Sequence, residues 1–180
     1  MHKSSYDLMS VFVAKYAQRL NINRIKVLDF GSRDINGSYK KLFSSDRYDY
    51  VGIDIEDGEN VSHVVDDSYN WGMIEDASFD IVISGQSLEH TEFFWLVFEE
   101  FKRVLKHQGL LCCIAPSAGP EHRHPFDCWR FLPDGFRALC KLVKFDVLEC
   151  YLLESTLHDD GSEQWKDSIL IAQNNDSPIR

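Results

Sequence analysis

The sequence lacks any pair of cysteines in the C-x-x-C spacing, and its five cysteines are an odd number. Cys112 and Cys113 stand side by side in an apolar run, where thiols usually pack as small hydrophobic side chains. The cysteines therefore indicate neither a zinc site nor a disulfide framework, and we expect no metal. This cysteine usage is typical of a reducing compartment, so we expect a cytoplasmic protein.

Long apolar runs and an excess of basic residues are also missing. No segment reaches the length that crosses a bilayer, and the N-terminal segment lacks the uninterrupted apolar stretch of a secretory signal. The 29 acidic residues outnumber the 19 basic ones, which gives a formal net charge of -10. Because phosphate contacts require lysine and arginine in excess, we expect no nucleic-acid partner. We also expect no membrane span.

The sequence does contain short apolar runs that alternate with helical patterns. Its 180 residues suit one domain, which we divide into a helical segment at 1–23 and the main domain at 24–180. Apolar strands that alternate with helices predict an α/β fold, in which helices cover both faces of a mostly parallel sheet. The predicted strands are 26–30, 50–54, 62–65, 79–84, 109–115, 144–153 and 167–172.

Side-chain spacing predicts three helices. Apolar residues spaced between 8 and 20 indicate a short amphipathic helix near the N-terminus. A second apolar stripe runs from Phe94 to Leu105, and Gly109 is the predicted stop of that helix. A third helix is expected to begin at Pro133, with Asp134 in its first turn.

In such a sheet, ligands bind outside the carboxyl ends of the strands, beside the first strand. There the stretch VLDFGSRDINGSY, residues 27–39, runs from a strand into a loop that contains Gly31 and Gly37. A dinucleotide fingerprint, G-x-G-x-x-G, needs glycine where this loop has Arg33 and Asn36. The loop therefore disfavours a pyrophosphate.

Acidic residues follow the first three strands, and together they favour a cation by Coulomb attraction. S-adenosylmethionine is a nucleoside cofactor with a sulfonium, an ammonium and no phosphate, and we predict that it binds at this edge. Asp54 is placed to accept hydrogen bonds from the ribose hydroxyls, and Asp29 to hold the ammonium. Ile55 would lie against the adenine, whose amino group would donate to Asp66 or Asp67. Because single acids at strand ends also cap helices and form turns, the prediction rests on the combination.

Four motifs in order resemble those of class I S-adenosylmethionine-dependent methyltransferases, in particular the group called methyltransferase type 11. They are VLDFGSRDINGSY, YVGIDIEDG, FDIVISGQSLEH and RVLKHQGLLCCIAPS. The resemblance runs from about Arg24 to the end of the chain. It implies a Rossmann-like, seven-stranded sheet whose last strand is antiparallel. The cofactor residues predicted from the loops and from the resemblance are Asp29, Gly31, Ser32, Arg33, Asp54, Ile55, Asp66, Asp67, Ser84 and Gln86.

The segment GPEHRHPFDCWRFLPDGFRAL, residues 119–139, resembles a subgroup found among enzymes of glycan and cell-surface polysaccharide biosynthesis. The usual pattern there reads E-H-R-Y-P-x-D-x-W-R-F, and this chain has His124 in place of the tyrosine. The resemblance favours a small-molecule or glycan acceptor.

This loop is dense in polar and aromatic side chains, and long ordered loops tend to be functional. We predict His122 as the general base, because a histidine titrates near neutral pH, and Asp127 to orient it or to substitute for it. His90 is either a second base or a residue of a helix terminus. The predicted acceptor contacts are Arg123, His124, Trp129 and Arg130. A metal bound by His122, His124 and Asp127 is not favoured, because H-x-H is common in loops.

The sequence thus predicts O-methylation of a sugar or other hydroxyl-bearing metabolite by in-line displacement. Two alternatives stay open, namely a non-catalytic S-adenosylmethionine-binding or scaffold protein on the same fold, and an NAD(P)-dependent oxidoreductase. No lid domain is inserted in the fold, so we expect an open acceptor site unless a second subunit of a homodimer closes it.

Overall fold

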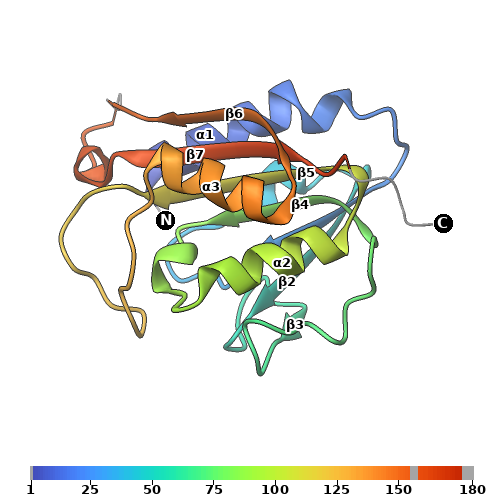
Figure 1. The fold of residues 1–180 in the computed structure, drawn as a ribbon, viewed down its shortest axis with the longest axis horizontal. Helices are drawn as coiled ribbons and strands as arrows, with labels where there is room; N and C mark the ends of the chain where they lie inside the picture. The colour runs from blue at the N-terminus through green and yellow to red at the C-terminus, as the bar shows by residue number, and fades with distance from the viewer. Residues whose placement is uncertain (1, 155–157, 176–180) are drawn as a thin grey trace.

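The computed structural model describes residues 2–154 and 158–175, which form one seven-stranded sheet with helices on both faces (Figure 1). The strands lie in the order β3-β2-β1-β4-β5-β7-β6. Their bounds are β1 Ile25–Phe30, β2 Tyr48–Asp54, β3 His63–Val64, β4 Phe79–Gly85, β5 Leu105–Pro116, β6 Asp146–Leu152 and β7 Asp167–Gln173. The α-helices are α1 Lys3–Lys15, α2 Phe94–Val104 and α3 Pro133–Val143, and the 3-10 turns are η1 Ala17–Arg19, η2 Lys40–Phe43, η3 Leu88–His90 and η4 Ser162–Trp165.

The pairing of the strands confirms the predicted fold class. β1 pairs in parallel with β2 on one side and with β4 on the other, so the strand order reverses at β1. β7 runs antiparallel to both of its neighbours, β5 and β6. The sheet is therefore Rossmann-like, and the carboxyl ends of β1 and β4 diverge around the crevice where such sheets bind ligands.

Two hydrophobic clusters hold the helices on the sheet. On one face α1 contributes Leu8, Met9, Phe12 and Val13 to a cluster shared with β1, β4, β5 and β7. On the opposite face α2 packs against β5 and α3 packs against β6 and β7, and Phe98, Phe101 and Phe136 are fully buried there. Figure 1 shows α2 and α3 in front of the sheet and α1 behind it. The apolar stripes read from the sequence are thus the faces that the helices bury.

The predicted end of the second helix at Gly109 is wrong. The helix ends at Val104, and β5 begins with Leu105, which pairs with Phe79 of β4. Leu105 is buried, as the helical stripe required, but it reaches the core from a strand. Gly109 lies within β5, where a Cβ atom would stand 2.8 Å from the carbonyl oxygen of Lys106. The glycine therefore permits a close backbone approach at an irregularity of the strand, after Gln108 with φ of 62°.

The third helix begins at Pro133, as predicted, and no side chain caps it. Among the described residues, no helix is long and apolar enough to span a membrane.

Candidate functional site

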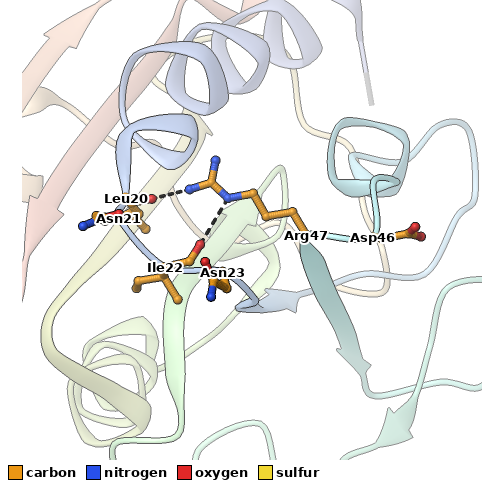
Figure 2. A pocket seen from close by; sticks show the side chains of 6 residues that line it. All are labelled: Leu20, Asn21, Ile22, Asn23, Asp46 and Arg47. Atoms are coloured by element: carbon orange, nitrogen blue, oxygen red, sulfur yellow. Dashed lines mark hydrogen bonds between the residues drawn. The ribbon is translucent and has the colours of Figure 1, made fainter.

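A cavity of about 670 Å³ opens at the carboxyl ends of β1, β2 and β4, a size typical of small-molecule sites. Its wall is built from the loops after these strands, from the loop at 117–132 and from His2 and Trp165. A smaller pocket of about 460 Å³ lies at the opposite edge of the sheet, before β1 and β2 (Figure 2). There Arg47 donates to the backbone carbonyls of Gln18, Leu20 and Ile22, so its charge tethers a loop.

The loop after β1 has no backbone N–H group to offer a phosphate at its start. The N–H groups of Gly31 and Ser32 both donate to the carbonyl oxygen of Ile53, at 2.9 and 3.1 Å. Arg33 N donates to Asp54 Oδ2 at 3.1 Å, and the next N–H, at position 34, donates to a backbone carbonyl. A phosphate cradle needs these groups unpaired and aimed at the ligand. These N–H groups instead donate to oxygens of the protein itself.

Gly31 is nevertheless required at the start of this loop. Its φ is +76°, and a Cβ atom there would lie 2.0 Å from Ser87 Oγ. The glycine thus allows the loop after β1 to touch the loop after β4. Arg33, at the position of the missing second glycine, forms an ion pair with Glu56 at the cavity wall. The arginine charge is therefore matched locally, and the wall keeps its acidic character.

The acidic end of the cavity is formed by Asp29 and Asp54. Asp29 is fully buried and accepts a hydrogen bond from the Tyr50 hydroxyl; burial raises its pKa to about 7, although this hydrogen bond opposes the shift. Asp54 is half-buried, and desolvation also raises its pKa above the usual range. Each of the two carboxyl oxygens of Asp54 accepts one backbone N–H, from Arg33 and Glu56. Because a carboxyl oxygen can accept two hydrogen bonds, Asp54 keeps acceptor capacity for a ligand.

The remaining predicted cofactor residues divide between the cavity and its surroundings. Ile55 is 48% exposed and lines the cavity, and so does Gln86, whose amide donates to Asp167 Oδ1 at 3.1 Å. Ser32 is buried in the wall. Ser84 is fully buried in β4 and does not line the cavity. Asp66 and Asp67 are exposed beside it, and Ser68 and Tyr69 form the wall in their place.

At the other end, three histidines and a glutamate meet. The ring centroids of His90 and His122 are 4.9 Å apart, and those of His90 and His124 are 5.8 Å apart. His90 Nδ1 lies 2.6 Å from the carbonyl oxygen of Phe126, and its Nε2 lies 3.7 Å from Glu89 Oε1. Burial lowers the pKa of both His90 and His122. These imidazoles are therefore neutral near pH 7, as a proton acceptor or a metal ligand must be.

The loop at 117–132 is held in place by an ion pair. Arg130 donates to both oxygens of Asp127, at 2.6 and 2.9 Å, and to the carbonyl oxygen of Pro120. Asp127 Oδ2 also accepts the backbone N–H of His122 at 2.7 Å and lies 3.5 Å from its Nδ1. The Arg130 guanidinium holds the pKa of Asp127 well below its usual range. Asp127 thus orients His122, while neither it nor Arg130 lines the cavity.

The other predicted acceptor residues are divided between the cavity wall and its surroundings. Arg123 and His124 line the cavity and are exposed, and Arg123 pairs with Glu121. Trp129 lies outside the cavity, where its indole N–H donates to the carbonyl oxygen of Glu92 at 3.1 Å.

Glu89 is a cavity residue with potential chemistry that the sequence did not predict. It is fully buried, lines the cavity and comes directly before His90 in the motif LEH. Its backbone carbonyl accepts the N–H groups of Cys128 and Trp129, so it also anchors the loop at 117–132. A glutamate beside an apolar leucine in the segment that follows a buried strand was the signal that could have found it.

Residues 28–113 match a family described as "Methyltransferase domain". Among solved structures, the 1,6-didemethyltoxoflavin-N1-methyltransferase of Burkholderia thailandensis, solved with S-adenosylhomocysteine bound, has a TM-score of 0.71 at 14% identity over 96% of this chain and 79% of its own. The CurJ carbon methyltransferase has a TM-score of 0.70 at 12% identity over 95% of this chain and 54% of its own. The [4+2]-cyclase SpnF has a TM-score of 0.71 at 15% identity over 95% of this chain and 82% of its own.

At these identities the likeness to solved structures shows the fold. No curated protein sequence matches the chain. The matched residues run from β1 into β5 and so include the loops after β1, β2 and β4 that wall the cavity. The chain therefore has the Rossmann-like fold of solved methyltransferases and a segment that matches a methyltransferase domain, which together support an enzyme whose cofactor is S-adenosylmethionine.

Proposed function

We propose that this methyltransferase acts on a hydroxyl oxygen of a sugar or another hydroxyl-bearing metabolite. The observation that supports it is the polarity of the cavity, which has carboxylates at one end and neutral imidazoles at the other. The carboxylates suit a cationic cofactor. The imidazoles suit an acceptor that must lose a proton, which a hydroxyl must do and a neutral amine need not do before it attacks.

In this proposal the cofactor lies across the loops after β1 and β2. Asp54 accepts hydrogen bonds from the ribose hydroxyls, and Asp29 faces the ammonium of the methionine part, directly or through water. Ile55 packs against the adenine. The groups beside the adenine amino group are Ser68 and Tyr69 of the cavity wall, rather than the exposed Asp66 and Asp67.

The chemical step is a single displacement. The acceptor oxygen attacks the methyl carbon in line with the bond to sulfur, the O–C bond forms as the C–S bond breaks, and S-adenosylhomocysteine leaves. The electrophile arrives activated, so the protein chiefly has to position the two reactants and exclude water, which can contribute about 7–11 kcal/mol. The proton of the hydroxyl leaves on the side of His90 and His122. The role of general base predicted for His122 fits its contact with Asp127, which holds the His122 backbone and lies 3.5 Å from the ring Nδ1.

The loop at 117–132 supports a sugar as the acceptor. It offers the cavity a cation, an imidazole and an exposed aromatic ring, from Arg123, His124 and Phe126. Sugars are commonly bound by this combination of hydrogen-bonding groups and an aromatic face. One chain supplies the whole described wall, including His2 and Trp165, so the proposal does not depend on the homodimer considered from the sequence.

A methyl-transfer assay with S-adenosylmethionine labelled in its methyl group tests the proposal. The acceptor panel should contain free, nucleotide-linked and lipid-linked sugars, together with matched amines and the corresponding deoxysugars. We expect label in at least one hydroxyl compound and none in the analogue that lacks that hydroxyl. Transfer to amines alone, or binding of cofactor without transfer to any member of a broad panel, would contradict hydroxyl methylation and favour the N-methyltransferase or the scaffold alternative.

A further inference from the structure

The carboxylate of Glu89 is buried in the wall of the cavity. The residue has no exposed surface, and among the described residues neither of its carboxyl oxygens has a hydrogen-bond partner. Burying an unpaired carboxylate is costly, so such a group either takes up a proton or faces a cation. Glu89 also lines the cavity, so an ion that entered from solvent could reach it.

The unprotonated ring nitrogen of His90 lies near the carboxylate of Glu89. Its Nδ1 lies 2.6 Å from the carbonyl oxygen of Phe126, which cannot donate, so Nδ1 must carry the hydrogen. The lone pair is therefore on Nε2, which lies 3.7 Å from Glu89 Oε1. A histidine that donates one ring N–H to a backbone carbonyl and turns the other nitrogen toward a carboxylate has the arrangement of a metal ligand.

His122 completes a set of three. Its Nδ1 is buried and has no hydrogen-bond partner in the described part of the chain, and Asp127, which is itself held by Arg130, lies beside the ring. One ligand atom from each of Glu89, His90 and His122 can be chosen so that all lie within 4.8 Å of one another. Ligands about 2.1 Å from a tetrahedral ion stand roughly 3.4 Å apart, so a small rotation of the half-buried His122 ring would close the set.

We propose that Glu89, His90 and His122 bind a divalent cation of the first transition row, such as Mn²⁺ or Zn²⁺. Two histidines and one carboxylate are a ligand set that such ions accept while keeping positions open for a substrate. The open side faces the cavity, where the proposed acceptor hydroxyl would coordinate the ion. The site differs from a set of His122, His124 and Asp127, because Asp127 is committed to Arg130 and to the backbone of His122.

This inference rests on the proposed function and changes one part of it. With an ion bound, His122 is a ligand, and the ion takes over the activation of the acceptor by lowering the pKa of the coordinated hydroxyl. The O–H proton passes to water in the open cavity, and the coordinated oxygen then attacks the methyl carbon as the C–S bond breaks. One carboxylate leaves the ion with a net positive charge, which stabilises the developing alkoxide.

Metal binding can be measured without turnover. The full-length chain, stripped with a chelator, is titrated calorimetrically with MnCl₂ and with ZnCl₂, and Mn²⁺ binding is followed independently by electron paramagnetic resonance. We expect one ion per chain, and a loss of affinity of at least about 100-fold in Glu89→Gln, because even residues behind the ligands typically contribute 10–100-fold. The matched control is Glu92→Gln, an exposed glutamate at the same cavity wall, which should bind the ion like the wild type.

Thermal melts with and without Mn²⁺ show whether each variant is folded and supply a second readout. The ion should raise the melting temperature of the wild type and of Glu92→Gln but not of Glu89→Gln. Equal metal affinity in wild type and Glu89→Gln would overturn the proposal, as would the absence of binding at millimolar metal. If Glu89→Gln does not fold, His122→Gln in the half-buried loop takes its place. The same samples are also titrated with S-adenosylhomocysteine, whose binding does not require the ion. Binding of S-adenosylhomocysteine without binding of metal would contradict the metal site alone, whereas no binding of S-adenosylhomocysteine would contradict the proposed function.

Discussion

At the scale of single residues, the buried carboxylate of Asp29 lowers the stability of the fold but supplies a negative charge at the cavity. It is buried beneath the cavity with one hydroxyl donor, and it lies near a second carboxylate, Asp54, which adds to the rise in its pKa. Its pKa in the folded chain is about 7 against 3.8 in an unfolded chain. The unfolded state therefore releases this proton more readily, so folding loses stability as the pH rises from about 4 to 7. A bound cation would offset this penalty.

The first prediction concerns Asp29→Asn without ligand. At pH 8 the variant should melt a few degrees above the wild type, at about 2–4 °C for each kcal/mol recovered, because the amide removes a buried charge. At pH 4, where the wild-type carboxyl is protonated, the two melting temperatures should converge. Differential scanning calorimetry at both pH values measures this, and a variant less stable than the wild type at pH 8 would contradict the raised pKa.

The pH dependence of cofactor affinity follows from the same group. Below pH 7 Asp29 is increasingly protonated, and binding of a cation then requires the loss of that proton. The dissociation constant for S-adenosylmethionine should rise as the pH falls from 7 to 5.5, by up to about tenfold per pH unit. Asp29→Asn should bind more weakly and lack this dependence. Calorimetric titrations across this range test it, and a flat profile in the wild type would place Asp29 outside the cofactor site.

Asp54 is predicted to contribute through hydrogen bonds. Removing a charged acceptor typically costs about 1.5–3 kcal/mol, so Asp54→Ala should weaken S-adenosylhomocysteine binding by roughly 10- to 100-fold. Asp57→Ala, at an exposed position of the same loop, serves as the control. An unchanged dissociation constant for Asp54→Ala, measured by calorimetry, would show that the ribose lies elsewhere.

At the scale of elements, hydrogen bonds fix the loop at 117–132 to the rest of the cavity wall. Asp127 links the Arg130 side chain to the backbone of His122, and the carbonyl of Glu89 accepts two N–H groups from the loop. The elements that wall the cavity are thereby fixed to one another. Gly31 gives a second link, because the loop after β1 approaches Ser87 too closely for any side chain.

Arg130→Ala tests what the ion pair between Asp127 and Arg130 contributes to catalysis. It leaves Asp127 without its cation, loosens the positioning of His122 and should lower turnover at least about tenfold, while the affinity for S-adenosylhomocysteine stays within about twofold. Arg137→Ala, at an exposed ion pair on α3, is the matched control. A loss of cofactor affinity equal to the loss of turnover would mean that the loop supports the whole cavity and not the acceptor end.

The sequence predicted those helices and site residues whose position depends on a single physical cause. Apolar stripes identified α1 and α2, and Pro133 with Asp134 identified the start of α3. The acids after the strands pointed to Asp29 and Asp54, because a parallel sheet brings the carboxyl ends of its strands together. The end of α2 was missed, because Leu105 satisfies a helical stripe and a buried strand equally well. Glu89 was missed, because its importance comes from the absence of hydrogen-bond partners, which depends on how three distant segments pack.

At the scale of the whole molecule, the start of α1 meets the start of β7 at the cavity. His2 Nε2 lies 2.6 Å from Asp167 Oδ2 at the start of β7, and Asp167 also accepts hydrogen bonds from Ser4 and Gln86. Asp167 is fully buried, so one carboxylate ties α1, the loop after β4 and β7 together. The wall formed by His2 and Trp165 depends on this connection.

Asp167→Ala should therefore destabilise the fold as a whole. Leaving several buried donors unpaired costs on the order of 3 kcal/mol, which corresponds to a fall in melting temperature of about 6–12 °C for a chain of this size. Calorimetry against Asp57→Ala measures the effect. A change no larger than that of the exposed control would mean that the network at the start of α1 adds little to stability.

The central claim is that the crevice beside β1 binds a cationic nucleoside without a phosphate. Calorimetric titration of the purified protein with S-adenosylmethionine, and in parallel with NADH, tests it most directly. The acidic wall, and the N–H groups at 31–34 that already donate to the protein, predict one S-adenosylmethionine per chain and no measurable heat with NADH. Tight binding of NADH with no binding of S-adenosylmethionine would contradict the account.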